Sequence, residues 1–566
     1  MAEAFRPLAW APRATLAALA LPVAAGLAGT ILPGLGWMPA LGGERLDLAP
    51  WHALLGTPGI ARSAGLSLAT GLIATLLSLG CVVLIMASLS GTRAFDVVRH
   101  AISPILSVPH AAAAFGLAFL IAPSGWIVRA LSPWATGWER PPDWLVPGDP
   151  MGLTLIAGLA TKEIPFLMLM AIAALPQTDA ERSLRVALTL GYGRVAAWVA
   201  CVFPRIYAQI RLPVYAVLAY SLSNVETALI LGPSTPPTLA VRLTAWMRDP
   251  DLAVWLKASA GATLQLVLVL VAFALWVAGE RAAILIGRRW ILRGGRAPRD
   301  GLARGFGVVM AGMVSLPVFL GLAGLAIWSV AGFWRFPDLL PGSFTLTGWT
   351  RAGPDLLDLA ATTILIAGGA VVAGLTLVLA CLEHGARSGA RPGTAALLLL
   401  YLPLLIPQIS FLFGLQILGL WSGFDGTLWA VIFAHGVFVL PYLYLSLADP
   451  WDALDPRLAV AAATLGAGPN RVFWRVRLPM MLGPILTAGA VGLAVSIGLY
   501  LPTLLVGAGR VPTLTTEAVA LAAGGDRRLI GVYALLQAAL PFLGFALALG
   551  LPALIWRNRR AMRAGW

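Results

Sequence analysis

Apolar segments of about 20 residues recur along the whole chain, and this recurrence limits the possible folds more than any other feature. Each segment is long enough to cross a hydrocarbon layer about 30 Å thick. Hydrophobic residues make up 59% of the 566 residues and charged residues 11%, whereas soluble domains are about 45–50% apolar and about 25% charged. The sequence therefore predicts an all-α, polytopic membrane protein, because helices satisfy their own backbone hydrogen bonds in lipid.

Proline, glycine and charged residues divide the apolar stretches into about twelve candidate transmembrane helices. They cover residues 14–32, 61–88, 101–122, 151–175, 207–231, 254–280, 306–332, 356–381, 395–420, 428–449, 482–507 and 530–555. A basic stretch at 288–305 follows the sixth span and is interpreted as a cytoplasmic linker. We therefore expect a first half at 1–287 and a second half at 306–566, each with six spans.

Most of the arginines lie in loops on the side of the N-terminus, and the opposite loops are rich in tryptophan. This distribution predicts that the N- and C-termini are both cytoplasmic. The net charge of +14 then reflects loop orientation, and no nucleic-acid partner is expected. Cys81, Cys201 and Cys381 have no metal-type spacing, so neither a metal nor another cofactor is expected.

A duplicated segment relates the two halves. LRVALTLGYGRVAAWVACVFP at 184–204 aligns without gaps on AVAAATLGAGPNRVFWRVRLP at 459–479, so that Leu184 pairs with Ala459 and Pro204 with Pro479. Earlier in each half, PHAAAAFG at 109–116 matches PQISFLFG at 407–414. Because six spans per half place both copies on one side of the membrane, the repeat is parallel.

Each long copy lies between the fourth and fifth spans of its half, within residues 176–206 and 450–480. Alanine, leucine and arginine favour short helices there, and Gly191 or Gly466 is placed to end the first of them. The pattern predicts two short cytoplasmic helices with a glycine hinge. Their small alanine side chains allow another protein to approach closely, so we interpret each pair as a docking element.

These segments resemble the signature of the inner-membrane permeases of bacterial ABC importers. That signature reads Glu-Ala-Ala, three residues, Gly, nine residues, an aliphatic residue, one residue, Leu-Pro. Neither copy has the glutamate, whose positions hold Arg185 and Val460. The ATPase-docking residues that the resemblance implies are Arg185, Ala187, Gly191, Gly193, Pro204, Val460, Ala461, Ala462, Gly466, Gly468 and Pro479.

The resemblance covers almost the whole chain and implies the type I (MetI-like) importer permease fold in the bacterial inner membrane. It implies two ATP-binding cassette subunits on the cytoplasmic side and a periplasmic solute-binding protein as partners. Two fused halves are similar to the thiamine and ferric-iron permeases, and residues 161–175 and 230–241 look closest to the YnjC-type branch. A thiamine-like cation is therefore the expected solute, with ferric iron or a polyamine as alternatives.

The chain itself is not expected to be an enzyme. A phosphate-binding loop needs a lysine directly after its last glycine. The two lysines of the sequence, Lys162 and Lys257, follow Thr161 and Leu256. ATP hydrolysis would therefore belong to partner subunits.

Several polar residues within the predicted spans are candidates for the translocation path, because charges in a membrane are costly unless paired or hydrated. Lys162 and Glu163 lie near the middle of the fourth span, and Asn224 and Glu226 lie in the outer third of the fifth. Adjacent helical residues point apart, so we expect Lys162 to reach Glu226 rather than Glu163. These residues either line the path or fix the helix register as an ion pair.

Three further candidates carry weaker signals. His435 lies at nearly the equivalent place in the second half, where a packing role is the alternative. His110 and Gln408 follow the matched prolines Pro109 and Pro407. A proline removes a backbone donor and can kink a helix, which leaves carbonyl groups facing a cavity.

A proton- or sodium-coupled secondary transporter is the main alternative, since such proteins are also built from parallel halves. It would couple through Glu163 and Glu226. The permease interpretation is favoured because a secondary transporter has no need of two matched docking elements. A membrane-embedded enzyme is disfavoured because the sequence offers no metal-ligand cluster and no nucleophile paired with a base.

Overall fold

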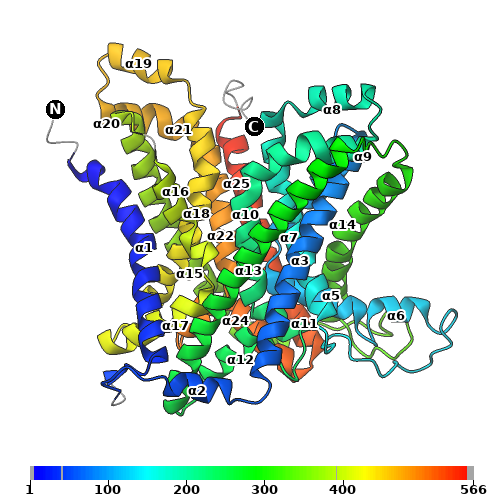
Figure 1. The fold of residues 1–566 in the computed structure, drawn as a ribbon. Coiled ribbons are helices and arrows are strands. Elements are labelled where there is room, and N and C mark those ends of the chain that lie inside the picture. The colour runs from blue at the N-terminus through cyan, green and yellow to red at the C-terminus, as the bar shows by residue number, and fades with distance from the viewer. Residues whose placement is uncertain (1–5, 40–42, 391, 558–566) are drawn as a thin grey trace.

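The computed structural model describes residues 6–39, 43–390 and 392–557, which form a bundle of helices (Figure 1). Within these ranges there is no β-strand, and two isolated β-bridges join loop residues. The described part contains 10 helices long and apolar enough to cross a membrane, or up to 12 when each of two bent pairs counts as one span. The predicted all-α polytopic fold is confirmed.

The helices that follow the predicted spans are mostly longer than predicted. In the first half they are α1 (Arg6–Gly34), α3 (Ile60–Leu89), α5 (His110–Ile121), α7 (Leu153–Ala174), α10 (Phe203–Ser223) and α13 (Ala253–Leu292). In the second half they are α14 (Gly301–Ser329), α15 (Thr347–Ser388), α17 (Gln408–Ser422), α18 (Leu428–Asp452), α22 (Leu482–Gly498) and α25 (Arg527–Ile555). Because α13 ends at Leu292 and α14 begins at Gly301, much of the predicted linker is helical.

Shorter helices connect these spans or extend them. They are α2 (Ala49–Leu55), α4 (Arg93–Ser107), α6 (Trp126–Leu131), α8 (Ala180–Thr189), α9 (Arg194–Ala197), α11 (Glu226–Leu231), α12 (Leu239–Trp246), α16 (Thr394–Leu405), α19 (Pro456–Thr464), α20 (Pro469–Val472), α21 (Leu478–Met480), α23 (Leu501–Val506) and α24 (Leu514–Leu521).

Two predicted spans, 101–122 and 395–420, are wrong as single helices. In the first half α4 ends at Ser107 and α5 begins after Pro109; in the second half α16 and α17 meet at an angle of 87°. Val108 and Ile406, the residues before the matched prolines, have extended backbone conformations. The cause is the proline, which disfavours helical geometry at the residue before it and has no N–H to donate.

Two further predicted spans, 207–231 and 482–507, are broken near their ends. The breaks fall at Asn224 and Leu499, which occupy equivalent positions in the two halves and have extended backbones. A side chain from another helix satisfies an equivalent carbonyl beside each break: Gln265 Nε2 donates to Leu222 O (3.0 Å), and Thr515 Oγ1 donates to Ile497 O (2.5 Å). The breaks therefore depend on tertiary contacts.

The first helix of each half packs against the other half. α1 lies along α15, α16 and α17, whereas α14 lies along α3 and α5. The crossing points are glycines: a Cβ added at Gly414 of α17 would overlap the carbonyl oxygen of Gly26 in α1, and one added at Gly116 of α5 would lie 2.9 Å from Gly321 in α14. Gly116 and Gly414 are the last residues of the matched segments, so the duplication includes both crossings.

The bundle has two distinct ends (Figure 1). The beginning of α1, the end of α25 and the short helices α8, α9, α19 and α20 lie at one end, which we call the docking face. The short helices α2, α6 and α12 lie at the other end, which we call the opposite face.

Candidate functional site

The first docking element consists of α8 and α9, joined by a sharp turn. Gly191 has a φ of +83°, a left-handed conformation that glycine adopts without steric cost. The turn lets the Gly191 N–H donate to Leu188 O (3.0 Å) and the Tyr192 N–H donate to Ala187 O (3.2 Å). Gly191 therefore ends the first helix, as predicted. A π-helical turn at Trp198–Val202 then leads into α10.

The second docking element, α19 and α20, repeats this geometry. Gly466 has a φ of +80°; its N–H donates to Ala463 O (2.9 Å), and the Ala467 N–H donates to Ala462 O (3.0 Å). These bonds join the residues that align with those of the first element. A π-helical turn at Phe473–Arg477 aligns in the same way with the turn before α10. The sequence duplication is thus a duplication of backbone structure.

The predicted docking residues differ in exposure between the elements. In the first element Ala187 and Gly193 are buried, whereas Arg185 is exposed and forms a 3.7 Å ion pair with Glu181. In the second element Val460 is 62% exposed. The equivalent side chains of Leu190 and Leu465 are 56% and 88% exposed, an apolar surface typical of a partner contact. The remaining predicted residues are exposed or half-buried, namely Gly191, Pro204, Ala461, Ala462, Gly466, Gly468 and Pro479.

The first docking element is held by the end of α3 and by the linker. Arg194 donates to the carbonyls of Ala87 (3.2 Å) and Ser90 at the end of α3. From the linker, the Arg296 carbonyl accepts the Gly193 N–H (3.0 Å). The Asp300 carboxylate accepts the Val195 N–H (2.7 Å). The linker therefore buries Gly193.

The second docking element is held by an ionic cluster instead. Glu383 of α15 is buried, and its carboxylate accepts from Arg387 Nε and from Arg477 Nη1, both at 2.6 Å. Arg387 Nη1 also donates to Asn470 Oδ1 (3.1 Å). Within the described ranges, no atom outside the local chain lies within 4 Å of a Cβ added at Gly468.

Neither Asp300 nor Glu383 was predicted from the sequence to support a docking element. Glu383 carried a usable signal, because an acid with an arginine four residues later at the end of an apolar helix predicts an i,i+4 pair.

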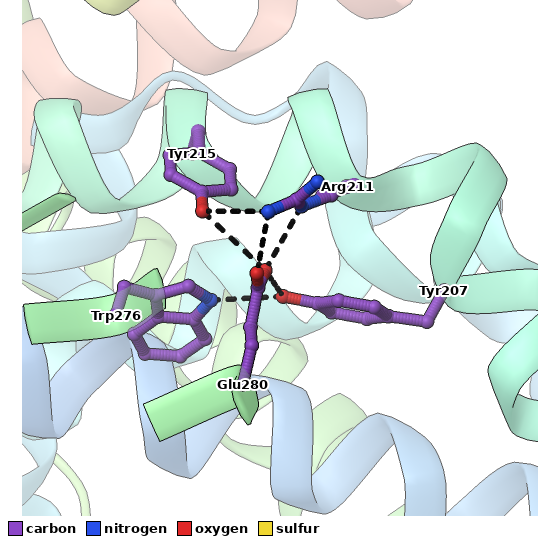
Figure 2. A network of polar contacts seen from close by, with 5 residues as sticks. All are labelled: Tyr207, Arg211, Tyr215, Trp276 and Glu280. Atoms are coloured by element: carbon purple, nitrogen blue, oxygen red, sulfur yellow. Dashed lines mark hydrogen bonds and ion pairs between the residues drawn. The ribbon is translucent and has the colours of Figure 1, made fainter. Parts of the chain in front are cut away.

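A polar network connects the first docking element to the helix that carries the linker (Figure 2). Glu280 of α13 accepts from three residues of α10: Tyr207 Oη (2.5 Å), Arg211 Nη2 (2.6 Å) and Tyr215 Oη (3.4 Å). Trp276 Nε1 donates to Tyr207 Oη (2.9 Å). Since α10 continues from the docking element and α13 continues into the linker, the element is fixed at both ends. Glu280 ended a predicted span, but its partners are not apparent from the sequence.

Lys162 binds the bend before Pro109 and does not reach Glu226. Its buried Nζ donates to Ile105 O (2.8 Å) and Val108 O (2.6 Å). These carbonyls lie where the bend interrupts the helix, so the ammonium group replaces the missing N–H donors. The expected contact with Glu226 is therefore not formed.

Glu226 instead lies in a buried polar group of the first half. Tyr220 Oη donates to Glu226 Oε1 (2.8 Å), and the His110 ring lies 4.8 Å from the Tyr220 ring. Asn224 Oδ1 accepts the Thr227 N–H (2.8 Å) beside the helix break. The structure thus brings together His110 and Glu226 through Tyr220. Tyr220 was not among the residues predicted from the sequence.

The other path candidates have different surroundings. Glu163 is buried, and its carboxyl group forms no hydrogen bond with another described residue. His435 is buried, with Nδ1 2.8 Å from Ser496 Oγ and Nε2 2.8 Å from Thr503 Oγ1. Gln408 is the half-buried first residue of α17.

Comparisons with known proteins agree with this architecture. Residues 373–558 match the family model described as binding-protein-dependent transport system inner membrane component. The chain is 32% identical over 503 residues to the inner membrane ABC transporter permease protein YnjC of Escherichia coli, covering 89% of this chain and 90% of that protein.

Shorter similarities reach two other permeases. The putative 2-aminoethylphosphonate transport system permease protein PhnV of Salmonella typhimurium is 29% identical, over 39% of this chain and 83% of that protein. The molybdenum transport system permease protein ModB of Mycobacterium bovis is 32% identical, over 21% of this chain and 50% of that protein.

Proposed function

Because the chain belongs to the binding-protein-dependent ABC transporter permeases, we propose that it is the membrane subunit of an ATP-driven importer. The two halves form the path for a small solute. Two separate ATPase subunits bind the docking elements, and a periplasmic binding protein delivers the solute to the opposite face. The docking face and both termini are then cytoplasmic.

The observation that carries this proposal is the pair of docking elements on one face. They share a glycine turn, hydrogen bonds and a π-helical turn at aligned positions of the duplicated segments. Each also exposes an apolar side chain, Leu190 or Leu465, at the same position. A secondary transporter has no use for such paired contacts.

The geometry supports a simple route for the transmission of force. When the ATPase subunits close on ATP, they move the docking elements toward each other. The first element transmits this motion through α10 and the Glu280 network to α13. The second transmits it through Glu383 to α15. Both long helices reach across the bundle, so the motion changes which face the path opens to.

For the solute, we propose an organic cation of the thiamine type. Glu163 and Glu226 are two buried carboxylates, whereas the nearby Lys162 ammonium is bound to backbone carbonyls. The aromatic ring of Tyr220 beside Glu226 offers a further cation contact. Ferric iron and polyamines are the alternative cargoes.

Coupling is tested by co-expressing the chain with the ATPase subunit that the proposal requires and reconstituting the complex in liposomes. We expect Leu465→Asp to lower transport-coupled ATPase activity at least tenfold, because it places a charge on the docking surface. Leu46→Asp, at a leucine between α1 and α2 that is 68% exposed, is the control and should retain ATPase activity. Uphill uptake driven only by a proton or sodium gradient would contradict the proposal.

The solute is identified separately, by thermal-shift screening of the proposed partner binding protein with thiamine, spermidine and ferric iron. Stabilisation by thiamine is the expected result. If another ligand stabilises the binding protein, that ligand replaces thiamine as the proposed cargo, and the coupling proposal is unaffected.

A further inference from the structure

An open pocket of about 440 Å³ lies at the opposite face, where α5 and α14 end and α25 begins. It is lined by Ser124, Arg129, Trp328 and residues 525–528. Its size lies within the range of about 300–1,000 Å³ typical of small-molecule sites. The pocket is separate from both docking elements and from the polar group around Glu226.

Two guanidinium groups converge on one carbonyl in this pocket. Arg129 is 4% exposed, and its Nε donates to Ser124 O at 3.0 Å. Arg527 Nη1 approaches the same oxygen at 3.4 Å. Arg129 Nη1 also donates to the carbonyls of Arg335 and Asp338, both at 2.8 Å, which fixes its position. The protein thus holds two like charges close together.

The position of Arg527 and Arg528 adds to this concentration of positive charge. They are the first two residues of α25, a 29-residue helix, and a helix N-terminus already carries a partial positive charge. The one acidic residue in the pocket lining, Asp526, accepts hydrogen bonds from the N–H groups of Arg528 and Leu529. The lining thus contains one carboxylate and three guanidinium groups, and Asp338 adds a second carboxylate near Arg129. A bound anion would balance the remaining positive charge.

Arg527 retains donors for such an anion. Its guanidinium lies over the rings of Phe119 and Trp328, at 5.8 Å and 5.4 Å, which hold it in place. The long contact with Ser124 O is its one hydrogen bond to the described residues. A guanidinium has five N–H donors in a planar fork that fits phosphate oxygens. Several donors of Arg527 are therefore available to a ligand.

We propose that this pocket binds a phosphate-class oxyanion, held by Arg527 and Arg528 with Arg129 behind them. The group is either a free phosphate or phosphonate, or the phosphodiester of a lipid headgroup that reaches the pocket. In both cases the recognised chemistry is a tetrahedral phosphorus centre with anionic oxygens, which suits arginine forks. The inference is independent of the proposed cargo, which binds elsewhere in the protein.

Free phosphate is tested by calorimetry with the full chain purified in a maltoside detergent without phosphate. We expect saturable binding of inorganic phosphate, weakened at least tenfold by Arg527→Gln and by Arg528→Gln. Arg45→Gln, an exposed arginine on the same face near α2, should leave binding unchanged. Arg528 is exposed, so Arg528→Gln provides the test even if Arg527→Gln does not fold.

The lipid source is tested by native mass spectrometry of the same preparations. Retained phospholipid that is lost in Arg528→Gln but kept in Arg45→Gln supports the headgroup as ligand, even where free phosphate binds weakly. Failure of the wild type to bind phosphate and to retain phospholipid would overturn the proposal. So would acetate binding as tight as phosphate with the same arginine dependence, because the site would then recognise a carboxylate.

Discussion

At the scale of single residues, buried polar side chains repair interrupted helices. Lys162 binds two carbonyls at the bend before Pro109, and Gln265 and Thr515 bind carbonyls beside the breaks at Asn224 and Leu499. Backbone carbonyls inside a bundle need donors when a helix is interrupted. These side chains therefore stabilise one bend that Pro109 causes locally and two breaks, at Asn224 and Leu499, that the local sequence does not encode.

Replacement of Lys162 should destabilise the protein. Lys162→Met leaves the carbonyls of Ile105 and Val108 without their donor, and a buried unsatisfied group costs about 1–3 kcal/mol. Thermal denaturation in detergent measures the loss. Lys257→Met is the control, since Lys257 is half-buried over the Trp246 ring, a contact of about 0.5–1 kcal/mol. A normal melting temperature with lost transport would place Lys162 on the path instead.

Asp149 should make stability depend on pH in the acid range. Burial acts to raise the pKa of this carboxyl, but donation from the Thr154 hydroxyl and from the Thr154 and Leu153 N–H groups lowers the pKa below its ordinary value. The ionised form therefore stabilises the folded state. This stabilisation is complete at pH values above the unfolded pKa of about 3.9. This stabilisation is lost as the pH falls through the lower folded pKa.

The measurement compares the stability of wild type and Asp149→Asn between pH 7 and pH 3. At pH 7 the wild type should be more stable by about 0.3–1 kcal/mol, because a carboxylate at a helix N-terminus is favourable. The difference should narrow below about pH 4. Asp143→Asn, in the exposed part of the same loop, is the control for the loss of a carboxylate.

At the scale of elements, the structure depends on close helix crossings and on the supports of the docking elements. The crossings of α1 with α17 and of α14 with α5 bring glycine backbones together. The supports join short helices to long ones through the linker, Glu280 and Glu383. Both kinds of contact link segments far apart in the sequence.

Gly414→Ala should disrupt the crossing of α1 and α17. The added Cβ would overlap the carbonyl oxygen of Gly26, so the helices must separate and lose packing. Overpacking of this kind costs about 1–3 kcal/mol, which thermal denaturation detects. Gly436→Ala in α18 is the matched control, because nothing lies within 4 Å of its added Cβ. Equal melting temperatures for both variants would contradict the crossing.

Asp300→Ala should loosen the first docking element alone. The change removes the acceptor of the Val195 N–H. Hydrogen–deuterium exchange should then become faster at residues 193–197 and stay unchanged at 468–472, which have the same backbone geometry but no contact with Asp300. Unchanged exchange at 193–197 would show that the linker does not support this element.

The sequence predicted those elements that a local pattern encodes. Long apolar segments predicted the helices, and the repeated Gly191 and Gly466 predicted the docking turns. The breaks at Asn224 and Leu499 could not be predicted, because the donors that satisfy the carbonyls come from other helices. For the same reason the sequence did not reveal the partners of Lys162 and Glu280 or the pairing of Glu383 with Arg477, since a pairing across the bundle leaves no periodic signal.

At the scale of the whole molecule, the exchange of α1 and α14 makes the two halves interdependent. Each half packs the first helix of the other. We therefore expect residues 1–294 and 295–566, co-expressed as separate chains, to assemble and to co-purify through a tag on one of them. Either half alone should aggregate, because the apolar surface that packs against the other half would be exposed. Size-exclusion chromatography measures both outcomes, and a monodisperse single half would contradict this expectation.

Because the two docking elements have different supports, the two halves of the molecule are not equivalent at the docking face. The first docking element is bound to the linker through Asp300, and the second is held by the buried ionic cluster at Glu383. Under the proposed function, two identical ATPase subunits would therefore bind two docking elements that have different supports. The two contacts would then differ in stiffness, so the two ATPase subunits of the proposed complex would act on this single chain unequally.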